Sequence, residues 1–295
     1  MAPVPEDNPA PRPPGPDASG APGAPGALDA SGASGGASVT AGSLNLPLSP
    51  VAADRVRWSS VVATLVAAVA LLVAQDSGYA ATLGVTLVLG LALAWGWPLL
   101  SGSWTPEATT VVLAVASVAI VLSALREDLL WVPAAVAFGI VLSFFGQLVR
   151  RTGREGLVLT LLSSFGGLVV IASGTTAVVA ADTDRGQAVA VVAMAAVGAA
   201  VVTDLLAGVR AAVPVLGFVA LAVAVLAAVV AASRFAGVGT LEALGIGAAA
   251  GTVSWSFRRV LALQPAMLTV RGQVGAGVGS VLVVGAVVHL FAVLA

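Results

Sequence analysis

Long runs of apolar residues follow one another along the chain from about residue 58 onward, separated by short segments that contain Gly, Pro or charged residues. About 20 helical residues cross a bilayer core about 30 Å thick, and nine of the runs have about this length. The pattern therefore predicts an all-α fold, a polytopic transmembrane helix bundle of about nine spans. The predicted spans are residues 58–75, 79–100, 108–125, 129–149, 156–177, 187–207, 211–232, 238–257 and 274–294.

Composition agrees with this pattern and sets the amino-terminal segment apart. Hydrophobic residues make up 59% of the 295 positions and charged residues only 9%, whereas about a quarter of the residues in soluble domains are charged. Residues 1–54 hold 11 of the 16 prolines, mostly among Gly, Ala and Ser, and such a segment has too few large apolar groups to order itself. We therefore expect a disordered tail over residues 1–54 and a transmembrane helical domain over residues 55–295.

The placement of arginine predicts the orientation of the bundle, because cytoplasmic loops retain more Arg and Lys than translocated loops do. With nine spans and a cytoplasmic amino terminus, nine arginines fall inside and three outside, leaving aside the one in the tail. Without the eighth span the distribution would be six against six. The six tryptophans all lie close to predicted span ends, where this side chain prefers the headgroup level. We expect a cell-membrane protein with a cytoplasmic amino terminus and an outer carboxyl terminus.

The residue inventory excludes several kinds of chemistry. The chain has no Cys and one His, and all 13 of its basic residues are Arg. Thiolate sites, Schiff bases and lysine-dependent nucleotide sites are therefore excluded. We expect no cofactor and no bound metal. We also expect no nucleic-acid partner, because that would require a concentrated basic surface.

One polar segment lies in the middle of a predicted span, at Ser163, Ser164, Gly166 and Gly167. Two glycines beside two hydroxyls can unwind a helix and offer backbone groups to a ligand, as in discontinuous transporter helices. The alternative, which we favour, is close helix packing through small residues. A polar path through the bundle would be lined by these serines and by further polar side chains, namely Thr82, Thr86, Ser143 and Gln147.

Ionisable residues within spans are costly and are candidates for function. Glu242 and His289 lie at similar depth in the last two spans, so we expect a polar pair there, either a proton-responsive gate or, as we favour, a structural hydrogen bond. Asp204 lies near the inner end of its span, within reach of water or Arg210. The pairs Gly247 with Gly251 and Gly275 with Gly279 predict a close approach of the last two helices.

An inner basic rim is predicted at the cytoplasmic side. Its members are Arg150, Arg151, Arg154, Arg258 and Arg259. We expect these arginines to contact the phosphates of anionic lipids, so that the bilayer is the main partner of the chain. A specific anionic substrate site is the alternative. A further membrane-protein partner is also compatible with the sequence.

A resemblance to known proteins is carried by residues 145–154, FGQLVRRTGR, and continues through Leu157 and Val158 to Gly166 and Gly167. This segment resembles a group of actinobacterial multi-pass membrane proteins that are often labelled permeases. The resemblance implies an inner-membrane address. Gly153 and Arg154, leading into a helix with paired glycines, are also similar to phosphatidate cytidylyltransferases, but this chain has no Asp or Glu after Glu242 to hold the magnesium of that chemistry.

Three functions follow from these observations. The first is a permease-like protein that moves a small molecule or lipid by an uncoupled route, because no Asp, Glu, Lys or Arg lies near the middle of a span. The second is a non-catalytic membrane scaffold or subunit of a larger complex. The third is a lipid-modifying enzyme. Ligand contacts in the first case are expected at Gln147, Ser163, Ser164, Gly166 and Gly167.

Overall fold

The computed structural model describes residues 47–49, 53, 55–126, 129–149, 156–209, 215–234 and 237–294. The chain divides into two units, Met1–Ser38 and Val39–Ala295, and all the described residues belong to the second. The tail predicted over residues 1–54 therefore lies outside the described residues, apart from residues 47–49 and 53. Leu48 N–H donates to the carbonyl oxygen of Leu263 at 2.8 Å, and Ala53 is buried. Leu48 and Ala53 therefore pack against the helices.

The described part of the chain is helical and contains no strand, which confirms the predicted all-α bundle. The α-helices are α2 Trp58–Asp76, α3 Tyr79–Leu100, α4 Pro106–Ser123, α5 Val132–Leu148, α6 Leu157–Ala180, α7 Asp184–Val202, α8 Leu216–Ala232, α9 Thr240–Leu261, α10 Val270–Leu282 and α11 Gly285–Leu294. Short 3-10 helices follow some of them, at η2 Ala124–Arg126, η3 Thr203–Gly208 and η5 Pro265–Leu268. Helices satisfy their own backbone hydrogen bonds, as a segment surrounded by hydrocarbon must.

The helices lie where the spans were predicted, and the last of them contains a break. Six segments are long and apolar enough to cross a membrane: α2, α3, α4 with η2, α6, α7 with η3, and α10 with α11. Helices α5 and α8 are apolar but shorter, at 17 residues each. Helix α9 has 22 residues but carries three charged side chains. The chain is therefore an integral membrane protein in its architecture, while the count of nine spans and their orientation stay predictions.

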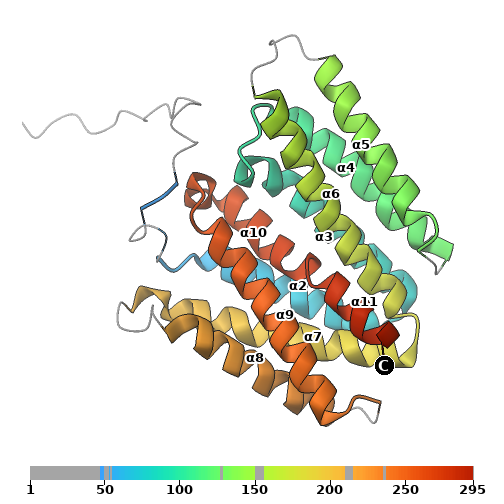
Figure 1. Ribbon diagram of the computed structural model, residues 1–295, viewed down its shortest axis with the longest axis vertical. Helices are drawn as coiled ribbons and strands as arrows, with labels where there is room; N and C mark the ends of the chain where they lie inside the picture. The colour runs from blue at the N-terminus through green and yellow to red at the C-terminus, as the bar shows by residue number, and fades with distance from the viewer. Residues whose placement is uncertain are drawn as a thin grey trace, which may run out of the picture. The chain divides into compact units, whose positions relative to one another are not determined.

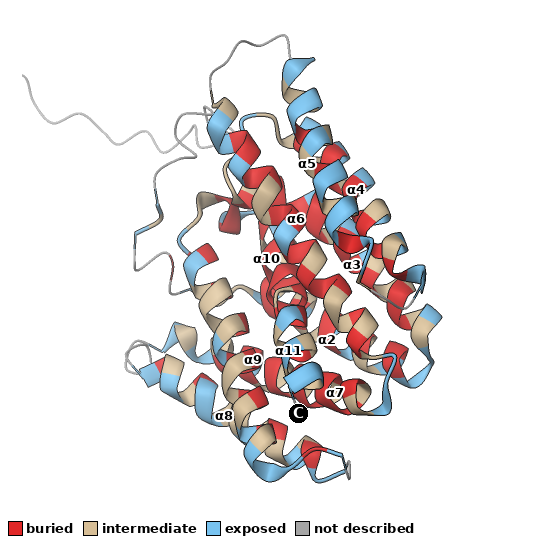
Figure 2. Ribbon diagram, turned by 45° about the vertical axis from the view of Figure 1, so that its right-hand side comes forward, coloured by how far each residue is buried: buried red, intermediate tan, exposed pale blue. Residues whose placement is uncertain are grey.

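Two groups of helices flank a central pair (Figure 1). Helices α3, α4, α5 and α6 pack together on one side, and α7, α8 and α9 pack together on the other. Between the groups, α2 and α10 pack against each other, and each also contacts a helix of both groups. Helix α5 lies at the periphery, where most of its residues are exposed or half-buried (Figure 2).

Small residues let particular helices approach closely, although for the most part not the pair expected from the sequence. A Cβ on Gly251 would lie 2.4 Å from the Ala224 Cβ, and one on Gly247 would lie 2.7 Å from the Ala228 Cβ, so these glycines face α8. A Cβ on Gly275 would lie 2.9 Å from the Cα of Gly96, in α3. The expectation that the pairs bring the last two helices together holds only for Gly279, whose added Cβ would lie 3.0 Å from the Phe257 ring of α9. The other three glycines face α8 or α3 instead.

Candidate functional site

The last predicted span is interrupted inside the bundle. Helix α10 ends at Leu282 and α11 begins at Gly285, with Val283 and Val284 in a turn. Because α10 has 13 residues, the turn lies about 20 Å along the helix axis from its start, at 1.5 Å per residue. A depth of about 20 Å falls within a hydrocarbon core about 30 Å thick. The break therefore places irregular backbone in the interior of the bundle.

A serine of α6 forms hydrogen bonds with the backbone at this break. The Ser173 hydroxyl donates to the Val283 carbonyl oxygen at 2.9 Å and accepts from the Ala286 N–H at 2.9 Å. One side chain thus satisfies an acceptor and a donor that the interruption frees, which an apolar interior requires. A Cβ on Gly285 would lie 1.8 Å from the Ser173 carbonyl oxygen, so only glycine permits this contact. The break is a result of helix packing, since no proline lies in the segment.

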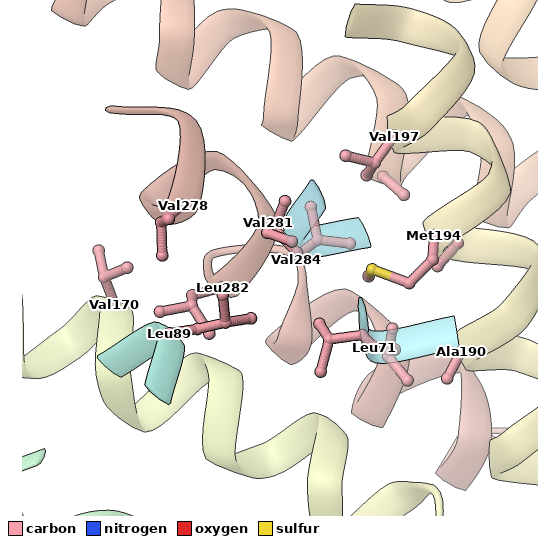
Figure 3. Packing of buried hydrophobic residues seen from close by; sticks show 14 of the residues in the cluster. Leu71, Leu89, Val170, Ala190, Met194, Val197, Val278, Val281, Leu282 and Val284 are labelled. Carbon is pink, nitrogen blue, oxygen red and sulfur yellow. The ribbon is translucent and has the colours of Figure 1, made fainter. Parts of the chain in front are cut away.

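An internal cavity adjoins the break. Six helices contribute its walls: α2, α3, α6, α7, α10 and α11. Its apolar lining includes Leu71, Met194, Val281 and Leu282, whose packing is seen from close by in Figure 3. Its volume is about 10 Å³, which is room for about one water molecule. In this conformation the cavity is therefore nearly closed.

Three polar side chains also line the cavity: Gln75 from the end of α2 and Thr82 and Thr86 from the start of α3. All three are buried. The Gln75 side-chain oxygen is buried without a hydrogen-bond partner, whereas its backbone carbonyl accepts from the Gln187 amide at 2.8 Å. A buried amide oxygen without a partner is costly and suited to accept a hydrogen bond from a small polar molecule. Thr82 and Thr86 are two of the polar residues expected along a path.

The segment Ser163 to Gly167 is not unwound, because α6 is continuous from Leu157 to Ala180. A Cβ on Gly167 would lie 2.8 Å from a Leu113 methyl, and one on Gly166 would lie 3.0 Å from the Trp97 ring. The favoured interpretation, close packing, therefore holds for both glycines. The alternative, a helix unwound at these residues, is wrong. The last span contains a break that the sequence analysis did not predict.

The two serines of this segment are engaged in contacts between and within helices. The Ser163 hydroxyl lies 2.5 Å from the Ser101 hydroxyl. The backbone carbonyl oxygen of Ser163 accepts a hydrogen bond from the Trp97 indole N–H at 2.7 Å. Ser164 donates to the Thr160 carbonyl one turn earlier at 3.1 Å. Neither serine lines the cavity described above. Both join α6 to its neighbours or to its own backbone.

Gln147 lies near the end of α5. It is half-buried, and its side-chain oxygen is buried without a hydrogen-bond partner. No hydrogen bond in the described part of the chain joins Gln147 to Ser163 or Ser164. The five residues expected to contact a ligand are thus not brought together in one cavity.

The predicted pair of Glu242 and His289 is corrected by the structure. Glu242 accepts from Arg185 at 2.7 Å, from the start of α7. His289 Nδ1 is buried without a hydrogen-bond partner, and no hydrogen bond joins it to Glu242 among the described residues. The sequence analysis placed Glu242 and Arg185 on the same side of the membrane, but it chose His289 rather than Arg185 as the partner of Glu242.

Arg258 is likewise not part of an exposed rim. It lies in the last turn of α9 with 5% of its side chain exposed, and its Nε donates to Asp204 of η3 at 2.7 Å. Its Nη1 donates to the hydroxyl of Ser254 at 2.7 Å and lies 3.5 Å from that of Ser280. The Arg258 side chain is therefore not exposed at the surface, because it points into the bundle, and its contact with lipid phosphates stays a prediction. Asp204 is paired with Arg258 rather than with Arg210, which lies outside the described residues.

The other members of the predicted rim divide into two sets. Arg150, Arg151 and Arg154 lie outside the described residues. Arg259 is half-buried in the last turn of α9. Close to it, Arg57 donates to the carbonyl oxygens of Ala53 at 3.1 Å and Ala262 at 2.9 Å. The arginine-rich end of the bundle therefore includes side chains from before α2 as well as from α9.

Sequence reasoning missed Ser173, Gly285 and Gln75. A signal for the first exists in the run Ser173, Gly174, Thr175 and Thr176, which is unusually polar for the interior of an apolar helix. No protein-family model, curated protein or solved structure matches the chain. The site is therefore interpreted from its own geometry.

Proposed function

We propose that this integral membrane protein is permease-like and moves a small uncharged polar molecule by an uncoupled route. The observation that carries the proposal is the interrupted last span beside a buried cavity with polar lining, at the junction of six helices. Discontinuous helices with irregular backbone at membrane depth are tolerated where they are buried in protein or line a cavity, and transporters use them at substrate sites.

The lining of the cavity indicates which solutes it suits. Gln75, Thr82 and Thr86 offer hydrogen-bond donors and acceptors, and the remaining lining residues are apolar or glycine. No ionisable side chain is among the lining residues of this cavity. A charged solute would be left without a counter-charge at that depth. The absence of a carboxylate or histidine from the lining also favours a route without proton coupling.

Passage of a solute requires the cavity to widen. Helix α11 is joined to α10 only through Val283 and Val284, and its polar attachment to α6 at the break is Ser173. A short turn of this kind can act as a hinge by changing a few backbone angles. We propose that movement of α11 about this turn opens the cavity toward the end of the bundle where α2 ends and α3 begins.

The absence of cysteine from the sequence allows a direct test with single cysteines in the full chain. Thr86→Cys places a thiol in the cavity wall. Ser117→Cys is the matched control, because Ser117 is fully buried on α4 and is not part of the lining. Ser77→Cys, between α2 and α3, is the exposed reference. Each protein is treated with a membrane-impermeant maleimide, in cells and in inverted vesicles.

We expect Thr86→Cys to react in cells, more slowly than Ser77→Cys on the outer side. It should also react in inverted vesicles, where Ser77→Cys faces the lumen and is protected, while Ser117→Cys stays unreactive in both. If Thr86→Cys and Thr82→Cys are both folded and both as unreactive as Ser117→Cys, the cavity does not open. That result would contradict the permease-like proposal and favour a membrane scaffold instead. Folding is checked for each variant by its elution as a single species in detergent.

A further inference from the structure

Two hollows meet at the arginine-rich end of the bundle. The first has a volume of about 50 Å³ and is lined by four arginines and one carboxylate, namely Arg55, Arg57, Arg258, Arg259 and Asp204. The second is a groove of about 450 Å³ between α8 and α9, within the range of about 300–1,000 Å³ that holds small-molecule ligands. Trp255 and Arg259 line both. The two hollows therefore adjoin each other at these two side chains.

The first hollow is strongly basic. Among the described residues of its lining, four arginines and one aspartate give a formal charge of +3. Asp204 is committed to Arg258 Nε at 2.7 Å and is only a quarter exposed, at 25%. The Nη2 group of the same guanidinium is buried without a hydrogen-bond partner. Guanidinium groups match the geometry of phosphate oxygens and form strong charge-assisted hydrogen bonds with them.

The groove has the opposite character. Phe218 and Leu221 of α8 form one side of it, and Gly251 and Thr252 of α9 contribute to the other. Phe218 is 77% exposed, on a surface that faces hydrocarbon in a membrane-embedded bundle. Trp255 lies at the junction of groove and basic hollow, where its amphipathic ring suits the boundary between headgroup and acyl chain. A Cβ on Gly217 would lie 2.9 Å from the Trp255 ring, so this glycine makes room for it.

We infer that this end of the bundle binds an anionic glycerophospholipid, with its phosphate in the basic hollow and one acyl chain in the groove. The charge of the hollow selects a phosphate group. The apolar groove that adjoins it at Trp255 selects a lipid over free phosphate. This site lies at the end of the bundle remote from the cavity, so the inference does not depend on the proposed transport of a solute.

The lipid's headgroup contacts are tested with paired arginine variants of the full chain, purified in a neutral detergent. Arg55→Gln with Arg259→Gln removes two charges from the hollow. Arg126→Gln with Arg234→Gln removes two charges from exposed positions outside it and is the matched control. Binding of phosphatidylglycerol and of phosphatidylcholine is measured by native mass spectrometry. We expect the hollow variant to lose affinity for phosphatidylglycerol by about 10- to 100-fold, and the control to keep it.

The acyl-chain contacts are tested separately. Thr252→Phe fills the groove, whereas Val88→Phe adds the same ring to an exposed position on α3. We expect Thr252→Phe alone to weaken phosphatidylglycerol binding, and inorganic phosphate to compete poorly with the lipid. Equal binding of phosphatidylcholine would overturn the inference. So would effective competition by phosphate together with unchanged lipid binding in Thr252→Phe, because the ligand would then be free phosphate.

If the double variant fails to fold, the single variant Arg55→Gln replaces it in the binding measurement, because Arg55 is exposed and we expect its replacement to leave the fold intact. We expect it to weaken phosphatidylglycerol binding by about tenfold. Unchanged binding in a folded Arg55→Gln protein, with the lipid still bound by the wild type, would place the phosphate elsewhere and overturn the assignment.

Discussion

The hydroxyl of Ser173 lies 2.9 Å from the carbonyl oxygen of Val283, a residue 110 positions later in the chain. Through this contact α6 meets the one interruption of the last span among the described residues. The same hydroxyl accepts from the Ala286 N–H, the second backbone group beside the turn. A single side chain thus stabilises irregular backbone within the bundle and fixes where α11 begins.

Replacing this hydroxyl tests its importance for the fold. Ser173→Ala should lower the free energy of unfolding by about 1–3 kcal/mol, because the change leaves buried backbone groups without their partner. Ser117→Ala is the control. The Ser117 hydroxyl donates only to the Leu113 carbonyl of its own helix, so its removal should cost less. Unfolding in detergent by increasing SDS measures both, and equal losses would argue against a special role for Ser173.

Glycine at position 285 is predicted to be indispensable. Gly285→Ala should strongly destabilise the protein or displace α11, because the new Cβ would lie 1.8 Å from the Ser173 carbonyl oxygen. Gly84→Ala in α3 is the matched change, since a Cβ there meets nothing within 4 Å. It should be neutral or stabilise by up to about 1 kcal/mol, the difference between Gly and Ala in a helix. Thermal denaturation of both variants distinguishes these outcomes.

The buried ion pair gives a third prediction. Asp204→Leu should destabilise the protein by about 3–5 kcal/mol, because it leaves the Arg258 charge buried and uncompensated. The double change Asp204→Leu with Arg258→Leu should recover much of the loss, because two apolar residues need no partner. A double-mutant cycle on unfolding free energies measures the coupling. A double variant as unstable as the sum of the single variants would contradict this pairing.

The second ion pair provides a comparison for the first. Arg185 and Glu242 are separated by 2.7 Å, with 33% and 18% of their side chains exposed. Because Arg185 is far more exposed than Arg258, whose side chain is 5% exposed, water screens this pair more, and Glu242→Gln should cost about 1 kcal/mol or less. If Glu242→Gln destabilises the protein as much as Asp204→Leu does, the difference in burial does not determine how much each ion pair contributes to stability. The same unfolding measurement serves for both.

The order and bounds of the helices follow closely from the apolar pattern. The second span was predicted at residues 79–100 and forms α3 Tyr79–Leu100, because Gly78, with a φ of 104°, ends the preceding turn and the polar segment from Ser101 ends the run. Apolar runs of this length have one stable backbone form in hydrocarbon. Local sequence is therefore sufficient for most of the fold.

Features that depend on packing between distant segments were less accessible. Val283 and Val284 are as apolar as their neighbours, and Gly285 after them is one of 34 glycines in the chain, so it does not by itself predict a break. The serine that stabilises the break lies on another helix. In the same way, Arg258 satisfies the charge rule for a cytoplasmic loop, but α9 continues past it to Leu261 and turns it inward toward Asp204. Charge counts predict on which side of the membrane a residue lies, whereas the direction of its side chain depends on the helix that carries it.

Both proposals rest on the helices crossing a bilayer with their arginine-rich ends on the cytoplasmic side. Single cysteines test this most directly, at Ser233 after α8 and at Leu268 between α9 and α10, both of which are exposed. In intact cells, a membrane-impermeant maleimide should label Ser233→Cys and should reach Leu268→Cys only after permeabilisation. Labelling of both positions in intact cells, or of Leu268→Cys alone, would contradict the arrangement.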